Sequence, residues 1–513
     1  MAFFFEETNR LVLPNWRSFA NTAKIGELNG SKKLLIEKSF NPDITDIIDG
    51  WIDSQTIGMA GDLLGVAIVC NKEDDPNVIN AAKFIKANPE ISSRELLSTA
   101  NIILNNGKVK EKTILDSDKF ESFQERANLF FVYERISDLK RKLRINPKNS
   151  ILWIEIARFY SIIGQNMQAE RAIKNAFQIS PENRFVLRAM ARFYTHIGKV
   201  DYAHDIIRKL PITKYDPWIM ATEISLAMKR GRFSRFIKPA FNMVNSSDFH
   251  PFNISELNSS LGTLEMESSL KKSKKFFNDS LIKPNDNSLA QAEWISHKES
   301  NFLRVNPSEY EIENNYEAKA RDASEHGKWQ DSVDYAKLWF LDMPFSRDAI
   351  LFGSEVAANN LNNHDEAENL YKAGLTSHPN DSQMLNNIVY SMCLNNRFSE
   401  AEKYLNKFKF VDNQASIDHQ ICIIATKGLY YFRKGLPDIG RTYYFDAINK
   451  ASEENKQLLA NIAFVNYVRE EYLLGSDIDD EIKNKITELR KNSQSKTIKK
   501  IIAEIDSISA SQI

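Results

Sequence analysis

The sequence predicts an all-α protein built from repeated pairs of antiparallel helices. The chain of 513 residues holds only 18 Gly and 15 Pro, about half of the roughly 12% that these two residues make up in an average protein. Because Gly and Pro interrupt regular structure, their scarcity indicates long regular elements with short connections. Many prolines recur at a fixed interval, and the apolar residues between them follow the i, i+3, i+4, i+7 spacing of an amphipathic helix.

Seven prolines are separated by 33 to 36 residues within two series: Pro147, Pro181, Pro217, Pro251 and Pro284, then Pro344 and Pro379. Between the first of them, Gly164, Gly198 and Gly231 recur at nearly the same spacing. A fixed period of this length is the sequence signature of a repeat architecture. We therefore expect each unit to contain a helix, a turn at the glycine and a second helix that ends before the proline.

The clearest unit covers residues 150–183. Each of its two helices presents one apolar stripe, and the turn falls at Gly164. The stripe residues are Trp153, Ile156, Ala157 and Tyr160 on the first helix and Ala169, Ile173 and Ala176 on the second. A single hairpin of this kind leaves one apolar face uncovered, so it is stable only when it is stacked on its neighbours.

This pattern resembles the tetratricopeptide repeat, whose eight signature positions are all filled in 150–183. Partial matches occur in 184–217, 313–346, 348–381, the unit after it and 421–454, with departures at Leu210 and Lys319. Two units near 218–250 and 253–286 are degenerate. The resemblance covers about residues 116–488 and implies an α-solenoid, a right-handed superhelix whose first helices line a concave groove that holds a peptide or a folded partner.

Five segments are predicted along the chain. They are an irregular N-terminal arm with a repeat-like helical region (1–115), a first repeat array (116–286), a single-helix joint (287–312), a second array (313–454) and C-terminal capping helices (455–513). The last helix presents Ile498, Ile501, Ile502, Ile505 and Ile508 on one face. That face is either a cap that covers the final repeat or a dimer seam, and the sequence leaves the oligomeric state open.

The arm carries apolar residues that need burial. Trp16 and the run Phe3–Phe5 are expected to pack along the first helices. The alternative is that the arm binds a partner.

Composition and charge indicate a folded protein in a reducing compartment. The 67 Lys+Arg against 68 Asp+Glu give no basic excess of the kind that a dedicated nucleic-acid binder shows. The cysteines Cys70, Cys393 and Cys422 are odd in number and far apart. The chain start lacks a basic region before its apolar residues, and no apolar run is long enough to cross a bilayer. We expect a cytoplasmic protein without membrane contact.

Motifs for catalysis or cofactor binding are weak. Gly58, Gly61 and Gly65 do not match the spacing of a phosphate-binding loop, so we expect them to allow close helix packing. His419 and Cys422 stand three residues apart, yet a structural zinc site needs four ligands. We expect no enzymatic activity, no cofactor and no metal.

Basic residues in the first array are the leading candidates for partner binding. The resemblance places Arg158, Arg188, Arg192 and His196 on first helices, facing the groove. Guanidinium groups bind carboxylates and phosphates through two parallel hydrogen bonds. Residues 151–250 also carry 15 Lys+Arg against 8 Asp+Glu. The alternative interpretation is that these arginines only solubilise the groove; His196 and His204 are expected at the surface or in the groove.

The second array offers polar groups of another kind at the corresponding positions: Asn359, Asn360, Asn386 and Tyr390. Amides both donate and accept, which suits binding to a peptide main chain. Because the chain is rich in Asn throughout, these residues need not share a function.

Three functions are compatible with these features. The leading hypothesis is a non-enzymatic scaffold or adaptor that binds a protein or peptide partner, with an acidic segment recognised in the 150–250 groove. The second is a helical-repeat RNA- or DNA-binding protein that uses the same arginines and the basic run Lys271–Lys275, although such runs, like Lys140–Lys142, are commonly solvated helix faces. The third is a regulatory or sensor subunit of a bacterial stress or defence complex.

Overall fold

The computed structural model describes residues 10–18, 44–70, 72–92, 94–105, 129–246, 249–298, 302–312, 314–408 and 415–511. Over these ranges every regular element is a helix, and none is a strand. The described residues form two compact units, 10–349 and 350–511. The prediction of an all-α chain of helical hairpins is therefore confirmed.

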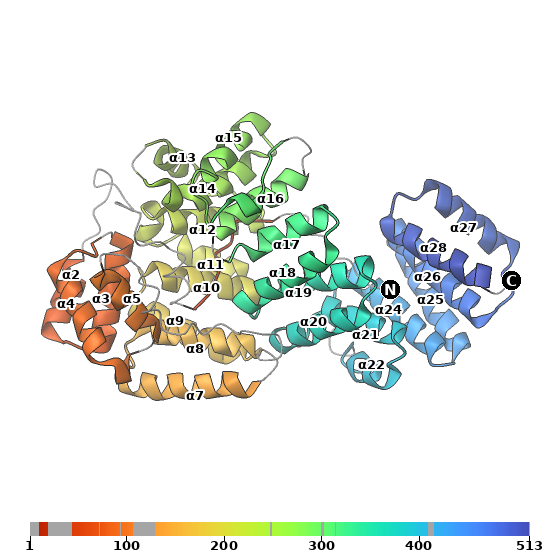
Figure 1. Ribbon diagram of the computed structural model, residues 1–513, viewed down its shortest axis with the longest axis horizontal. Coiled ribbons are helices and arrows are strands. Elements are labelled where there is room, and N and C mark those ends of the chain that lie inside the picture. The colour runs from red at the N-terminus through yellow and green to blue at the C-terminus, as the bar shows by residue number, and fades with distance from the viewer. Residues whose placement is uncertain are drawn as a thin grey trace. The chain divides into compact units, whose positions relative to one another are not determined.

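The first unit begins with five α-helices and one short 3-10 helix among the described residues and continues as helix pairs (Figure 1). Before the pairs come α2 (Thr45–Asp53), α3 (Ile57–Cys70), α4 (Pro76–Ala87), η1 (Pro89–Ile91), α5 (Arg94–Leu104) and α7 (Leu129–Ile145). The pairs are α8 (Ser150–Ile162) with α9 (Asn166–Ile179), α10 (Arg184–His196) with α11 (Val200–Ile207), α12 (Pro217–Lys229) with α13 (Ile237–Asn245), and α14 (Pro251–Glu265) with α15 (Leu270–Ser280). The short η3 (Pro211–Lys214) precedes α12. After the pairs follow α16 (Asp286–Lys298), η4 (Pro307–Glu309), and the pair α17 (Tyr316–Glu325) and α18 (Trp329–Asp342).

The second unit repeats the same pattern. Its helices are α19 (Arg347–Glu355), the π-helical turn η5 (Val356–Asn360), α20 (His364–Ser377), α21 (Ser382–Leu394), α22 (Phe398–Leu405), α24 (Ile417–Arg433), α25 (Pro437–Glu453), α26 (Gln457–Leu474), α27 (Asp480–Asn492) and α28 (Lys496–Ser511). The helices α24 and α25 pack closely, since a Cβ on Gly428 would lie 2.8 Å from the Tyr444 ring.

Many of the turns inside the hairpins place a residue in the left-handed region. Gly164, Gly198 and Gly231 have φ of 69°, 75° and 60° there. In the second unit, Asn362 and Asn396 take the same place with φ of 51° and 58°. Asn tolerates this conformation better than most residues that have a Cβ. The turn position therefore recurs along the chain, and it is filled by Asn in some hairpins and by Gly in others, such as Gly327 and Gly435.

Among the described residues, no α-helix follows α16 before α17, so α16 is a single helix rather than the first member of a hairpin. It belongs to the first compact unit. At the far end, Ile498, Ile501, Ile502 and Ile505 of α28 are buried, and α28 packs on α26. These four isoleucines are thus covered by their own chain and are not open to a second copy. The domain limits given above stay predictions.

The glycines of α3 lie where other segments approach it closely. A Cβ on Gly65 would come within 1.9 Å of Asn183 Nδ2, and one on Gly58 would come within 3.0 Å of the carbonyl carbon of Lys148. Asn183 is itself held, because its side chain accepts from Val186 N at the start of α10. Close packing is thus found at Gly58 and Gly65, although against residues just before α8 and α10 rather than between helices. Over the described part of the chain, no helix has the length and apolar character needed to cross a bilayer.

An acidic side chain is buried where α3 packs on α8. Asp62 is 6% exposed and accepts hydrogen bonds from Ser180 Oγ at 2.5 Å and Ser150 Oγ at 3.1 Å. Burial raises the pKa of Asp62 to about 7, against the lowering effect of the two hydroxyls. Asp62 is therefore a titrating group inside the first unit.

We predict that Asp62→Asn stabilises the protein at pH 8. Because the folded-state pKa lies above the unfolded value, the folded protein holds the Asp62 proton more tightly, and stability falls as pH rises from about 4 to about 7. The amide that replaces the carboxyl group cannot ionise, so the variant should gain on the order of 1–4 kcal/mol at pH 8 and little at pH 4. Denaturant unfolding of both proteins across this range measures the difference. The exposed Asp53→Asn should change nothing, and an equal effect of Asp62→Asn at both pH values would contradict the account.

Candidate functional site

Residues 10–18, called here the arm segment, are enclosed by helices of the first unit. This segment forms no regular structure and is drawn in red in Figure 1. Trp16 is 1% exposed, with its ring centroid 6.3 Å from that of Phe193 on α10 and 5.2 Å from that of Phe345. The predicted burial of Trp16 is confirmed, but it packs on helices far along the chain rather than on the first ones. Phe3–Phe5 lie outside the described residues.

Arg10 enters the site on the side of α16 and α17. Its Nε and Nη2 donate to the Glu317 carboxylate at 2.7 and 2.9 Å, and its Nη1 donates to Gln291 Oε1 at 2.7 Å. Although burial would raise the pKa of Glu317, Arg10 and Arg321 lower it to about 2. The Glu317 carboxylate is therefore ionised at neutral pH and pairs with the Arg10 guanidinium.

Two amides of α16 bind the main chain of the arm segment. Gln291 Nε2 donates to the carbonyl of Arg10 at 2.9 Å, and Asn287 Nδ2 donates to the carbonyl of Leu13 at 2.9 Å. Since Asn287 and Gln291 are four residues apart, they lie on one face of the helix. These contacts recognise an extended chain through its carbonyls, whatever its side chains are.

Arg17 anchors the other end of the arm segment through hydrogen bonds to two carboxylates. Its guanidinium donates to Asp286 at 2.6 Å and also to Asp342, while Asn15 Nδ2 donates to Asp286 at 2.6 Å. Burial alone would lower the pKa of Arg17, but the two carboxylates raise it above its ordinary value. We call the surface formed by Phe193, Asp286, Asn287, Gln291, Glu317, Asp342 and Phe345 the arm site.

Two of the arginines predicted to bind a partner are already bound inside the chain. Arg158 is 2% exposed, and its guanidinium donates to Glu155 at 3.1 and 3.3 Å. Arg188 makes a two-pronged contact with Glu256 at 2.7 and 2.9 Å. Their donors point at buried carboxylates, so neither guanidinium faces an open groove in this structure.

The other two predicted residues lie beside the arm segment. Burial lowers the pKa of Arg192, with Asp348 and Glu317 opposing and Arg10 and Arg17 adding to the effect. His196 packs edge-on to Phe345, with 5.5 Å between centroids. The predicted groove position of Arg192 and His196 thus coincides with the surroundings of the arm site, while their binding role stays a prediction.

The predicted position of His204 is wrong. His204 is 2% exposed, not at the surface or in a groove, and lies between Glu223 and Arg230 with contacts of 2.9 and 2.7 Å. Ala203 and His204 are both buried on α11, so the buried side of this helix is wider than the small-residue stripe alone. The histidine therefore satisfies buried polar groups of the core.

In the second unit, the residues predicted to bind a partner do not all lie at one site. Asn359 and Tyr390 line one pocket of about 460 Å³, and Tyr390 Oη donates to Asn466 Oδ1 at 3.4 Å. Asn386 is 1% exposed and donates to Asn387 at 3.0 Å. Asn360 is exposed. Sequence reasoning missed the charged residues of this pocket, because all of them except Arg433 come from the helices predicted to be a cap.

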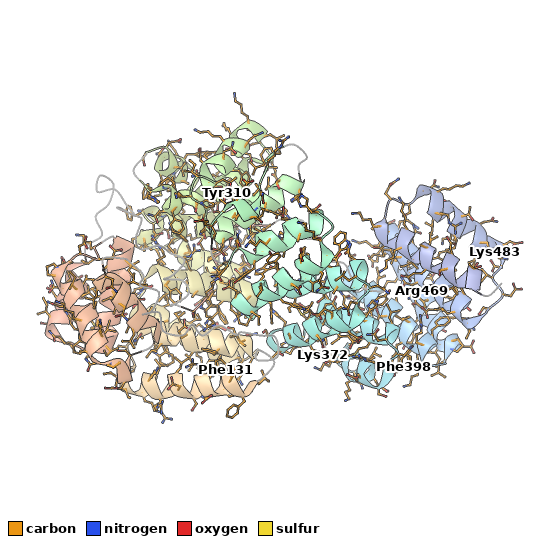
Figure 2. The ribbon with its side chains drawn as sticks, viewed as in Figure 1. Phe131, Tyr310, Lys372, Phe398, Arg469 and Lys483 are labelled. Atoms are coloured by element: carbon orange, nitrogen blue, oxygen red, sulfur yellow. The ribbon has the colours of Figure 1, made fainter. Side chains whose placement is uncertain are left out.

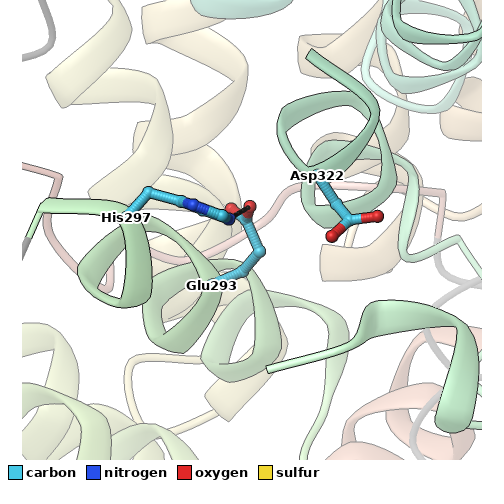
Figure 3. A group of neighbouring side chains, drawn as sticks. All are labelled: Glu293, His297 and Asp322. Carbon is cyan, nitrogen blue, oxygen red and sulfur yellow. Dashed lines mark ion pairs between the residues drawn. The ribbon is translucent and has the colours of Figure 1, made fainter. Parts of the chain in front are cut away.

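One group of side chains among the described residues has the composition of a metal site. Glu293 and His297 lie one turn apart on α16, with 3.0 Å between Oε1 and Nε2, and Asp322 faces them from α17 (Figure 3). Ligand atoms of the three lie within 4.8 Å of one another. Burial raises the pKa of Glu293, and the bond to Glu293 raises that of His297. Because these two groups already form an ion pair, we assign no metal here.

The structure shows why His419 and Cys422 are poor candidates for metal ligands. Cys422 is 1% exposed, and burial raises its pKa to about 12. The ring of His419 lies 2.9 Å from Ser382 Oγ. A thiol this hard to ionise behaves as a small core residue rather than as a ligand.

Comparisons with known proteins add little to this geometry. No model of a protein family matches the sequence, and no curated protein matches it either. Among solved structures, yeast Tom70 is similar over 76% of this chain and 95% of its own, with 12% identity and a TM-score of 0.28. The APC/C hetero-tetramer Cut9-Hcn1 is similar over 90% of this chain and 92% of its own, with 11% identity and a TM-score of 0.42. Likeness at this level does not carry a function from either protein to this chain.

We predict that Trp16→Ala destabilises the first unit by about 3–5 kcal/mol, the cost of removing a fully buried large aromatic side chain. Thermal unfolding followed by circular dichroism measures the loss. Phe233→Ala is the matched control, because Phe233 is 85% exposed, and surface substitutions usually change stability by less than about 0.5 kcal/mol. Equal melting curves for the two variants would show that the arm segment does not pack in the arm site.

Proposed function

We propose that this protein is a non-enzymatic scaffold whose first unit binds an extended protein segment in the arm site. The observation that carries the proposal is the pair of hydrogen bonds from Asn287 and Gln291 to main-chain carbonyls of the arm segment. Contacts of this kind, with pockets for alternate side chains, are how peptide-binding surfaces combine affinity with specificity.

The chemistry of the arm site defines the segment that it accepts. Asp286, Glu317 and Asp342 are acidic, and Phe193 and Phe345 receive an indole. A partner segment should therefore carry basic side chains and an aromatic one, as the arm segment does. This differs from the acidic segment that the sequence predicts for the first array, because Arg158 and Arg188 are bound to Glu155 and Glu256.

In this proposal, the arm segment occupies the site until a partner segment replaces it. A covalently attached segment acts at an effective concentration in the millimolar range for short flexible connections. A free partner therefore binds well only if its own contacts exceed those of the arm segment or if the arm segment is weakened. The arm site is thus a regulated binding site.

Nucleic-acid binding is the second candidate function. The side chains of Lys271, Lys272, Lys274 and Lys275 are exposed on α15, and such a run supports binding to phosphates. Arg158 and Arg188, which were predicted to contribute to the same basic surface, already bind carboxylates inside the first unit. Binding of any nucleic acid should weaken steeply with salt; no binding at low salt dismisses this candidate.

We predict that a peptide with the sequence of residues 8–20 binds the Trp16→Ala protein at least 10-fold more tightly than the unchanged protein. In the variant, the weakened arm segment competes less for the arm site. Fluorescence polarisation of the labelled peptide measures both affinities. A peptide with Ala at the Trp16 and Arg17 positions is the matched control and should not bind.

The variant Arg10→Ala loosens the same segment without opening a cavity at Trp16, so the test does not depend on one substitution. If both variants remain folded and neither binds the peptide more tightly than the unchanged protein does, the arm segment is a permanent part of the fold. That result would contradict the proposed function.

A further inference from the structure

A pocket of about 460 Å³ lies in the second unit, and helices α20, α21, α24, α26 and α28 and the turn η5 line it. Its charged side chains are Arg433, Arg469, Lys500 and Glu504. Arg469 lies on α26, among the helices coloured blue (Figure 2). The pocket is therefore built by residues of a single compact unit.

Arg469 has an unused hydrogen-bond donor. The residue is 4% exposed; its Nε donates to Glu470 at 2.9 Å and its Nη1 to Glu504 at 3.1 Å. Its Nη2 has no acceptor among the described residues. A buried donor of a charged group that lacks a partner destabilises the fold, because its desolvation is not compensated by a hydrogen bond. An acceptor that enters the pocket would remove this cost.

A second cation lies on the opposite wall. Lys500 Nζ donates to the carbonyl of Asn359 at 3.0 Å and to that of Ala358 at 3.4 Å, both in η5. An ammonium at the C-terminal end of a helical turn is favourably placed against its carbonyl dipoles. Burial lowers the pKa of Lys500, and the Arg469 charge lowers it further, against Glu504. An added negative charge would relieve this repulsion.

The other charges do not cancel these cations. Arg433 lines the pocket and donates to Glu470 at 2.5 and 3.2 Å. His364 adds no charge at neutral pH, because burial, Lys500 and Arg469 lower its pKa to about 4. Three cations against Glu504 and Glu470 leave one net positive charge around the pocket.

We infer that this pocket binds an acidic side chain of an extended segment of a partner protein, with its carboxylate between Arg469 Nη2 and Lys500 Nζ. The neighbouring lining suits the rest of such a segment. Amides for its main chain come from Asn359, Asn362, Asn395 and Asn466, and apolar contacts come from Leu394, Ile462 and Leu473. The free N–H of Arg469 and the ammonium of Lys500 are two donor groups, which match the two oxygens of a carboxylate.

This site is independent of the arm site. It belongs to the other compact unit, shares no residue with the arm site and takes the opposite charge. The two proposals can fail separately, because the peptide of residues 8–20 tests one and an acidic peptide tests the other.

The test uses the full chain and a pool of labelled pentapeptides with Asp or Glu at the centre and varied apolar or polar neighbours. Each peptide has a partner with Asn or Gln at the centre. We expect acidic peptides to bind at least 10-fold more tightly than their amide partners. Arg469→Gln and Lys500→Gln should each weaken binding about 10-fold or more, whereas Lys483→Gln, an exposed lysine on α27, should not.

Glu504→Gln keeps the test decisive if Arg469→Gln fails to fold. Glu504 is 36% exposed in its side chain, and removing its charge should tighten binding of the acidic peptides about 3- to 10-fold. The matched control is Glu488→Gln on α27. The inference is overturned if the acidic and amide peptides bind alike, if Glu504→Gln weakens binding, or if only phosphoserine peptides or inorganic phosphate bind.

Discussion

The packing of Trp16 between Phe193 and Phe345 is the contact on which the account of the first unit depends. It joins a segment near the start of the chain to helices more than 170 residues away. Helical hairpins contact mainly their neighbours in sequence, so a repeat array has few long-range links of its own. The arm segment supplies such links, through Trp16 in the centre and Arg10 and Arg17 at its ends. The face where a partner was expected is thereby occupied by the chain itself.

The two units offer surfaces of opposite charge. The arm site presents Asp286, Glu317 and Asp342 to arginines, whereas the pocket of the second unit presents Arg469 and Lys500. A surplus of like charge inside a protein is costly unless a partner compensates for it. In the first unit, the arm segment is that partner. In the second, Glu470 and Glu504 compensate the cations only in part, and we assign the acceptor for Arg469 Nη2 to another protein.

The sequence predicts the architecture well because the repeat is local. Gly164 and Gly198 mark turns, and the apolar stripes mark the helices, all within one hairpin. Asn362 and Asn396 were not predicted as turn residues, because they adopt the positive φ of the turn glycines although they are another residue type. The binding surfaces were harder to predict, because they combine distant residues. Nothing near Arg10 in the sequence points to Glu317, and Arg158 resembles a groove residue until Glu155 is seen to bind it.

A double-mutant cycle between Arg10 and Glu317 tests the central claim most directly. Free energies of unfolding are measured for the unchanged protein, Arg10→Ala, Glu317→Gln and the double variant. Because these side chains meet at 2.7 Å in a buried site, the account predicts a coupling energy of about 1–3 kcal/mol. Additive effects, with coupling below about 0.3 kcal/mol, would mean that the arm segment does not occupy the first unit, and the account would be wrong.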